Sequence, residues 1–187
     1  MGFDSVKYNR RSIRLKDYDY SQAGAYYVTM VAQNRECLFG NIANAEMQLN
    51  DAGEVSRAEW IALPQRFPNV ELDEFVIMPN HVHGIVVITD EERGVMRRGE
   101  VSSPSMLGGA TPSISGEATP LISGGATPPQ PMRPTLGQII AYFKYQTTKT
   151  INQSRDSAGT RIWQRNYYEH IIRNEKDLDR IRKYIFG

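Results

Sequence analysis

The sequence has a single cysteine, Cys37, among 187 residues, and it has no apolar run long enough to cross a bilayer. One cysteine excludes an intrachain disulfide and a zinc site built from cysteines, and it fits a reducing compartment. A membrane-spanning helix needs about 20 consecutive apolar residues. The start of the chain also lacks the apolar centre of a secretory signal. We therefore expect a cytoplasmic protein without a membrane partner.

The net charge is also small: 22 Lys and Arg residues and 21 Asp and Glu residues give a formal charge of +1. This balance argues against wholesale binding to a polyanion. The charge is unevenly distributed: residues 7–16 hold five basic side chains and no acidic one, and residues 161–187 hold seven basic against four acidic. Basic patches between tyrosines can contact phosphates and stack on bases, so nucleic acid is a candidate partner. A solvated charged arm is the alternative interpretation.

Aromatic residues are missing between Asp90 and Pro134, and 19 of the 36 residues from 99 to 134 are Gly, Pro or Ser. This segment repeats with a period of eight, as GGATPSIS, GEATPLIS and GGATPPQP. Such a composition buries too little apolar surface to fold. We expect residues 99–134 to be a flexible low-complexity insertion within one domain that spans residues 1–187.

The rest of the chain alternates between strand and helix patterns. The patterns predict strands at 25–32, 70–78, 81–89 and 166–173, and helices at 54–66, 135–151 and 175–186. The first helix is expected to pack through Val55, Ala58, Ile61 and Ala62, the second through Leu136, Ile139, Ile140, Phe143 and Thr147, and the last through Leu178, Ile181 and Ile185. This order predicts an α+β fold, a ferredoxin-like or RRM-like split β-α-β sandwich with an antiparallel sheet, helices on one face, and an additional C-terminal helix.

Two of the three histidines, His81 and His83, flank Val82 in the stretch MPNHVHGIVVI. Side chains at positions i and i+2 of a strand project from the same face, so both imidazoles are expected side by side. Two neutral imidazoles can bind one divalent metal ion together with a third ligand, which we expect to be oxygen. The alternative is a pair of histidines whose ring nitrogens bond to backbone groups.

Two histidines in a central strand, followed far downstream by a tyrosine on a helix, form a pattern that resembles the HUH endonucleases. More closely, the chain resembles the REP-associated tyrosine transposases, single-tyrosine enzymes that cut and join single-stranded DNA. The resemblance rests on three segments, RRSIRLKDYDYSQAGAYYVTMVAQNRECLFG, EFVIMPNHVHGIVVI and IWQRNYYEHIIRNEKDLDRIRKYI. Together they cover nearly all of the chain outside the repeats.

This resemblance implies that Tyr184, in the last helix, is the catalytic nucleophile. A phenol with a pKa near 10 needs a nearby cation or base to act at neutral pH. The resemblance also implies a divalent cofactor, Mg²⁺ or Mn²⁺, which His81 and His83 would hold and which would neutralise and position a phosphodiester. Attack by Tyr184 would leave a 5′-phosphotyrosine and a free 3′-hydroxyl, and the reverse reaction would rejoin the strands.

A third metal ligand in this family usually lies one helical turn after the tyrosine. That position would be 188, and the sequence ends at Gly187. We expect either that the chain is truncated or that another group substitutes. The candidates are Asn80, Gln164, Glu169 and His170; His170 is alternatively a support for a ligand, a DNA contact or a core residue.

The resemblance further implies binding to palindromic hairpin DNA and a homodimer. The expected DNA contacts are Lys7, Arg10, Arg11, Arg14 and Lys16, with Arg165 and Arg173 as candidates that could instead pair with acidic neighbours. Two other functions stay open. One is a noncatalytic hairpin-binding remnant without the C-terminal metal ligand, and the other is a metal-dependent phosphoesterase in which water is the nucleophile.

Overall fold

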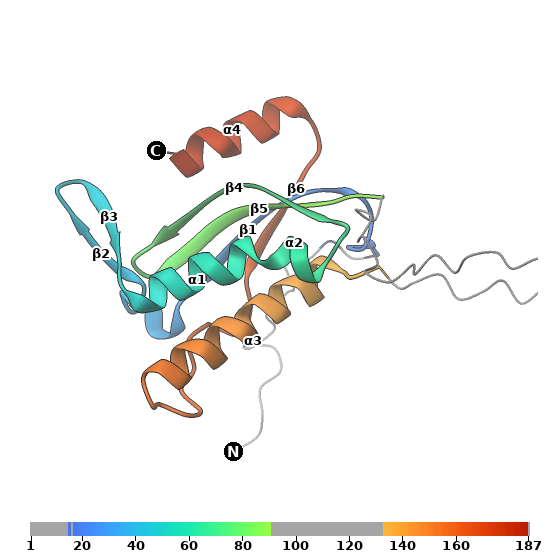
Figure 1. Cartoon of the computed structure of the whole chain (residues 1–187). Helices are drawn as coiled ribbons and strands as arrows, with labels where there is room; N and C mark the ends of the chain where they lie inside the picture. Colours follow the sequence, from blue (N-terminus) through green and yellow to red (C-terminus); the bar gives the residue numbers. More distant parts are fainter. Residues whose placement is uncertain (1–14, 16, 91–132, 187) are drawn as a thin grey trace, which may run out of the picture. The chain divides into compact units, whose positions relative to one another are not determined.

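Four antiparallel strands form the central sheet, in the order β4-β5-β1-β6 (Figure 1). The strands are β1 (Gly24–Val31), β4 (Val70–Met78), β5 (His81–Ile88) and β6 (Tyr168–Ile172). The structure is a computed structural model, and it describes residues 15, 17–90 and 133–186. Helices α1 and α3 connect β1 to β4 and β5 to β6. This is the ferredoxin-like chain order, so the predicted α+β fold is confirmed.

Helices α1 (Asp51–Ile61) and α3 (Leu136–Ser154) cover one face of the sheet, and α4 (Glu175–Phe186) lies over the other (Figure 1). Successive side chains of strand β1 point to opposite faces of the sheet and so pack against different helices. Its Tyr26, Val28 and Met30 are fully buried in the core that includes α3, whereas Tyr27 belongs to a smaller apolar cluster with residues of α4. The sheet therefore separates two packed layers.

Helix α3 begins and packs as its sequence predicts. Thr135 and Gln138 form a capping box, in which each side chain bonds to the other residue's backbone N–H. All five residues of the predicted stripe are buried: Leu136, Ile139, Ile140, Phe143 and Thr147. Burying a large apolar side chain contributes about 1.5–3 kcal/mol, so this stripe anchors α3 to the sheet.

The predicted packing face of α1 was wrong except at Val55, which packs against the core. Ile61 is 53% exposed, whereas Ala52, Ser56 and Trp60 are buried. The serine hydroxyl donates to the Ala52 carbonyl oxygen at 2.8 Å, so this polar residue is satisfied inside the core. The helix also begins three residues earlier than predicted, because the Asn50 side chain caps it by accepting from the Gly53 N–H.

A short hairpin between β1 and α1 was not predicted. It consists of β2 (Gly40–Ala43) and β3 (Glu46–Leu49), joined by Asn44 and Ala45, which both have positive φ angles, 53° and 63°. Two positive φ angles are typical of a two-residue hairpin turn, but alanine rarely occupies such a position. The turn therefore carries a weak sequence signal. The remaining helical segments are α2 (Leu63–Arg66) and the 3₁₀ turn η1 (Gln33–Arg35).

The predicted low-complexity insertion lies almost entirely outside the described residues, because only its last two positions, 133 and 134, are described. The insertion and the one-domain organisation therefore stay predictions. Within the described ranges, no helix has the length and apolar character needed to span a membrane.

Candidate functional site

The two histidines lie at the start of β5, on the face of the sheet that α4 covers. His81 pairs with Val31 of β1, and His83 pairs with Thr29. The centres of the two imidazole rings are 4.5 Å apart, with an angle of 76° between the ring planes. Strand alternation therefore brings both rings together, as the spacing predicted.

A fixed amide orients His81. The Asn80 side-chain Nδ2 donates to the Arg35 carbonyl oxygen at 3.2 Å, which turns Oδ1 of the same amide toward His81 Nδ1 at 2.6 Å. Because this oxygen can only accept, the proton of a neutral His81 must be on Nδ1. Burial lowers the pKa of His81 and so favours the neutral ring. Its Nε2 lone pair is then available to a metal ion, the arrangement that metal-binding histidines usually have.

His83 is held by two hydroxyl groups. Its Nδ1 lies 2.7 Å from Tyr27 Oη and 2.8 Å from Thr29 Oγ1, and the threonine hydroxyl donates to the tyrosine oxygen at 3.3 Å. Since that bond uses the only proton of Thr29, Thr29 can bond to His83 only by accepting from Nδ1–H. Burial, with a further contribution from His81, lowers the pKa of His83 to about 4. His83 is therefore neutral at pH 7, and the tautomer that donates from Nδ1 to Thr29 leaves Nε2 unprotonated.

Tyr184 lies beside the histidine pair although it comes from α4. Its ring centre is 5.4 Å from that of His83, with the planes at 70°, and 6.4 Å from that of Tyr27. The side chain is 65% exposed, so a large substrate can approach it. Ile181 and Ile185 fix this position, because they are buried against Tyr27 and β5. The apolar stripe of α4 thus presents Tyr184 at its margin.

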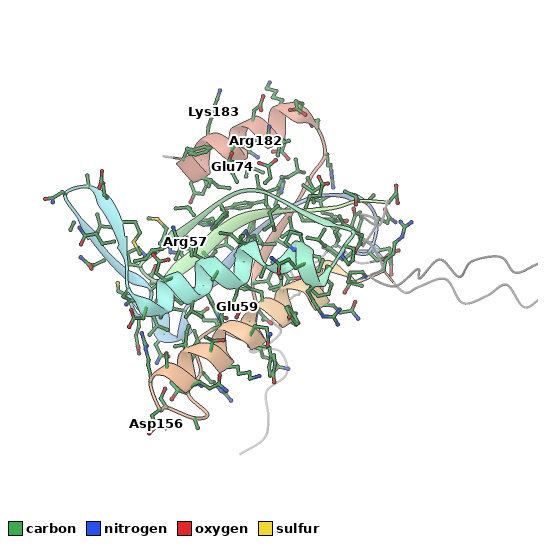
Figure 2. All side chains as sticks on the ribbon, in the orientation of Figure 1. Arg57, Glu59, Glu74, Asp156, Arg182 and Lys183 are labelled. Carbon is green, nitrogen blue, oxygen red and sulfur yellow. The ribbon has the colours of Figure 1, made fainter. Side chains whose placement is uncertain are left out.

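An ion pair adds a second attachment for α4. Arg182 donates from Nε and Nη2 to the two carboxylate oxygens of Asp73, at 3.0 and 2.6 Å. The hydrogen bond from Arg182 lowers the pKa of Asp73. The register of β4 shifts between Leu72 and Phe75, so two acidic residues, Asp73 and Glu74, occupy the place of one. Figure 2 shows Glu74 and Arg182 on the same side of the sheet.

The glycine after the histidine pair has a steric role on the opposite face. A Cβ at Gly84 would lie 2.4 Å from Trp60 Cζ2, far inside contact distance. The indole, which is fully buried, therefore occupies the place of the missing side chain. This packing fixes β5 directly beneath His83.

The four candidate third ligands lie in different places. Asn80 orients His81, and His170 Nε2 bonds to Asp177 Oδ2 at 2.8 Å. Glu169 pairs with the core residue Val28, so it projects from the opposite face of the sheet and is 8% exposed. Gln164 has its backbone N–H bonded to the Val31 carbonyl oxygen, so it lies across β1 from His81. Among the described residues, no group of three or more His, Cys, Asp or Glu side chains could hold a metal ion. The histidine pair alone nevertheless fits a metal, because its two neutral imidazoles are preoriented.

The predicted DNA contacts are only partly visible. Lys7, Arg10, Arg11, Arg14 and Lys16 lie outside the described residues. Arg165 and Arg173 are both exposed, on opposite ends of β6, and among the described residues neither forms an ion pair. The structure therefore does not bring them into one patch.

Sequence reasoning missed the residues that orient the histidines. Tyr27 and Thr29 alternate on β1 as His81 and His83 do on β5, so a correct pairing register would have identified them. Asn80 was a candidate metal ligand because it directly precedes His81 in MPNHVH. Its side chain instead bonds to His81 and to the Arg35 carbonyl oxygen, 45 residues away in the sequence.

Comparison with known proteins gives one sequence relative and a similar fold. No protein-family model matches the chain. A solved REP-associated tyrosine transposase, bound to a REP hairpin, has a similar structure with a TM-score of 0.54 and 16% identity, over 94% of this chain and 71% of that one. At this identity the similarity shows the fold alone. A Haemophilus influenzae protein, described as uncharacterized, is 41% identical over 186 residues, which cover 97% of this chain and 91% of the relative. The chain therefore belongs to the family of this Haemophilus influenzae protein.

Proposed function

We propose that the protein is a metal-dependent transposase that cleaves and rejoins single-stranded DNA at hairpin elements through a 5′-phosphotyrosine on Tyr184. The observation that carries this proposal is the packing of the Tyr184 ring against the His83 ring, whose centres are 5.4 Å apart. It places a solvent-accessible hydroxyl-bearing side chain next to two preoriented neutral imidazoles. The fold shared with a transposase that was solved with a DNA hairpin supports the same function.

Tyr184 is the nucleophile of the proposed reaction. Its Oη attacks the phosphorus, the P–O3′ bond breaks, and the products are a 5′-phosphotyrosine and a 3′-hydroxyl. The phenol proton passes to solvent, which the exposed side chain reaches, and the departing O3′ takes a proton from solvent. The covalent bond preserves the energy of the phosphodiester, so a second 3′-hydroxyl can displace the tyrosine and rejoin the DNA without ATP.

His81 and His83 would hold the divalent metal ion through Nε2. The bound ion would supply Lewis-acid stabilisation of the phosphate charge. The protein's own contribution is orientation: Asn80 fixes the ring of His81, while Tyr27 and Thr29 fix that of His83. Burial raises the pKa of Tyr27, which keeps this supporting phenol neutral.

The test is formation of a covalent protein–DNA adduct. The purified protein is incubated with a single-stranded hairpin oligonucleotide and Mn²⁺ or Mg²⁺, then separated on a denaturing gel. We expect an adduct with the wild type, and none with Tyr184→Phe or His81→Ala. Tyr168→Phe is the matched control, because Tyr168 is 50% exposed and lies on the same face, 6.3 Å from Tyr27 between ring centres.

The outcomes separate three functions. An adduct that is lost only in Tyr184→Phe and His81→Ala supports the transposase mechanism. Cleavage that persists in Tyr184→Phe contradicts it and indicates water as the nucleophile. Hairpin binding without cleavage in either metal indicates a noncatalytic DNA-binding protein.

A further inference from the structure

A second feature suited to nucleic acid lies between α3 and the segment that precedes β6. It is a groove of about 500 Å³. Its lining is Lys144, Tyr145, Thr148, Lys149 and Asn152 of α3, with Gly159, Thr160, Arg161, Ile162, Trp163, Gln164 and Arg165 of the following segment. Four of these twelve residues are cationic and none is acidic. The groove is therefore positively charged, although the whole chain is nearly neutral.

Three of the four cations of the groove remain available to a ligand. Lys149, Arg161 and Arg165 are exposed, and within the described part of the chain none of them forms an ion pair. Burial lowers the pKa of Lys144 to about 8, so this lysine still carries a charge at pH 7. Asp156, labelled in Figure 2, follows α3 but is not among the lining residues.

Hydrogen bonds hold both walls of the groove in place. Lys144 Nζ donates to the carbonyl oxygens of Gln164 and Asn166, at 3.0 and 2.9 Å. Asn152 Nδ2 donates to the Thr160 carbonyl oxygen at 2.9 Å. A site whose walls are fixed before binding loses less conformational entropy when a ligand enters.

An aromatic side chain accompanies the charges. Tyr145 is 63% exposed on the groove wall, one position after Lys144 and four before Lys149. Exposed aromatic rings among cations are typical of single-stranded nucleic acid sites, where bases stack on the rings and the cations contact phosphates. A duplex would not present its stacked bases to such a ring.

The groove and the histidine pair lie on either side of the end of β1. The Gln164 N–H bonds to the Val31 carbonyl oxygen at 2.9 Å, and Val31 is the cross-strand partner of His81. Adjacent strands are about 4.8 Å apart, so Gln164 and His81 are about two strand spacings, or roughly 10 Å, from each other. A bound single-stranded DNA of a few nucleotides therefore spans the distance between the groove and the histidine pair.

We infer that this groove binds the single-stranded DNA that flanks the cleaved bond, with phosphates on Lys149, Arg161 and Arg165 and a base stacked on Tyr145. The inference rests on the proposed function for the identity of the nucleic acid. It assigns the groove a positioning role, separate from the residues that touch the reacting phosphate.

The test measures DNA binding without cleavage. Fluorescence anisotropy of a fluorescein-labelled 20-nucleotide oligo-dT is recorded in EDTA over a series of salt concentrations. The variants are Arg161→Glu/Arg165→Glu, Tyr145→Leu and Tyr145→Phe. Lys176→Glu is the control, because Lys176 is an exposed cation of α4, outside the groove.

We expect the double charge reversal to weaken binding at least tenfold and to reduce the slope of log K against log salt by about 1.4, or roughly 0.7 for each lost phosphate contact. Tyr145→Leu should weaken binding about tenfold with an unchanged slope, and Tyr145→Phe should bind like the wild type. Wild-type affinity in the groove variants, or an equal loss in Lys176→Glu, overturns the inference. Loss of binding in the groove variants, in a protein that never forms an adduct, supports the groove and refutes only the Tyr184 mechanism.

Discussion

A single methyl group at Gly84 tests whether the packing beneath β5 positions the histidine pair. The Cβ of Gly84→Ala would lie 2.4 Å from Trp60 Cζ2, whereas carbon atoms in contact are about 3.5–4.0 Å apart. The strand and the indole must therefore separate by roughly 1 Å. The indole cannot easily retreat, because it is fully buried with ring centres of Phe143 and Phe75 at 5.3 and 6.1 Å.

The expected loss of stability follows from two opposing contributions. Overpacking a core costs about 1–3 kcal/mol. Replacing glycine by alanine restricts the unfolded chain, which offsets about 0.4–1 kcal/mol where the backbone tolerates alanine. Gly84 has no positive φ angle, so backbone strain does not add to the cost. We therefore expect Gly84→Ala to lower the free energy of unfolding by about 1–2 kcal/mol.

The effect on activity should exceed the effect on stability. His83 precedes Gly84 and projects from the opposite face, so moving β5 displaces its ring relative to Tyr184. A displacement of about 1 Å at a catalytic group can slow a reaction about 100-fold. The rate of adduct formation should therefore fall markedly under conditions where circular dichroism shows a folded protein.

A double-mutant cycle identifies the cause. Urea unfolding is compared for Gly84→Ala, Trp60→Phe and the double variant. Trp60 Nε1 has no hydrogen-bond partner among the described residues, so Trp60→Phe removes ring volume without breaking a hydrogen bond. If the overlap is responsible, alanine costs much less in the phenylalanine background. Costs that add within about 0.5 kcal/mol would refute the reasoning.

Two further predictions concern the histidines. Asn80→Ala removes the acceptor that fixes His81 Nδ1–H, so the Mn²⁺ affinity measured by titration calorimetry should fall about 10–100-fold. Asn80→Asp keeps an acceptor and should retain most of the affinity, whereas wild-type affinity in Asn80→Ala would contradict this orienting role. In the absence of metal, His83 has a pKa near 6.5 in the unfolded state and about 4 in the folded state. The unfolded state therefore binds the proton more readily, and the free energy of unfolding falls as the pH drops from about 6.5 to about 4. At 1.36 kcal/mol per pKa unit the full difference is about 3 kcal/mol, and solvent screening reduces our expectation to about 2 kcal/mol. Urea unfolding at pH 7 and pH 4 should show a smaller difference for His83→Asn, and an equal difference in both proteins counts against burial of His83 as the cause.

Local patterns determined most of the elements. The four strands of the central sheet, α3 and α4 follow from period-two and period-3.6 apolar patterns, and the shared face of His81 and His83 follows from their spacing alone. The buried face of α1 did not follow, because Ser56 and Trp60 are a polar residue and a bulky one. Ser56 can be buried because its hydroxyl bonds to the Ala52 carbonyl oxygen, and Trp60 can be buried because Gly84 has no side chain. Both contacts are known only from the tertiary structure.

The sequence by itself determined the chemistry that is present: two imidazoles on one strand and a tyrosine on an amphipathic last helix. Only the tertiary structure decided that they meet, because Ile181 and Ile185 dock α4 on the outer face of the sheet and bring Tyr184 to His83 from 101 residues away in the sequence. The same holds for the groove, whose two walls carry separate, unremarkable runs of polar residues. Spacing along the chain fixes which side chains share an element, whereas contacts between elements depend on long-range packing that no local pattern records.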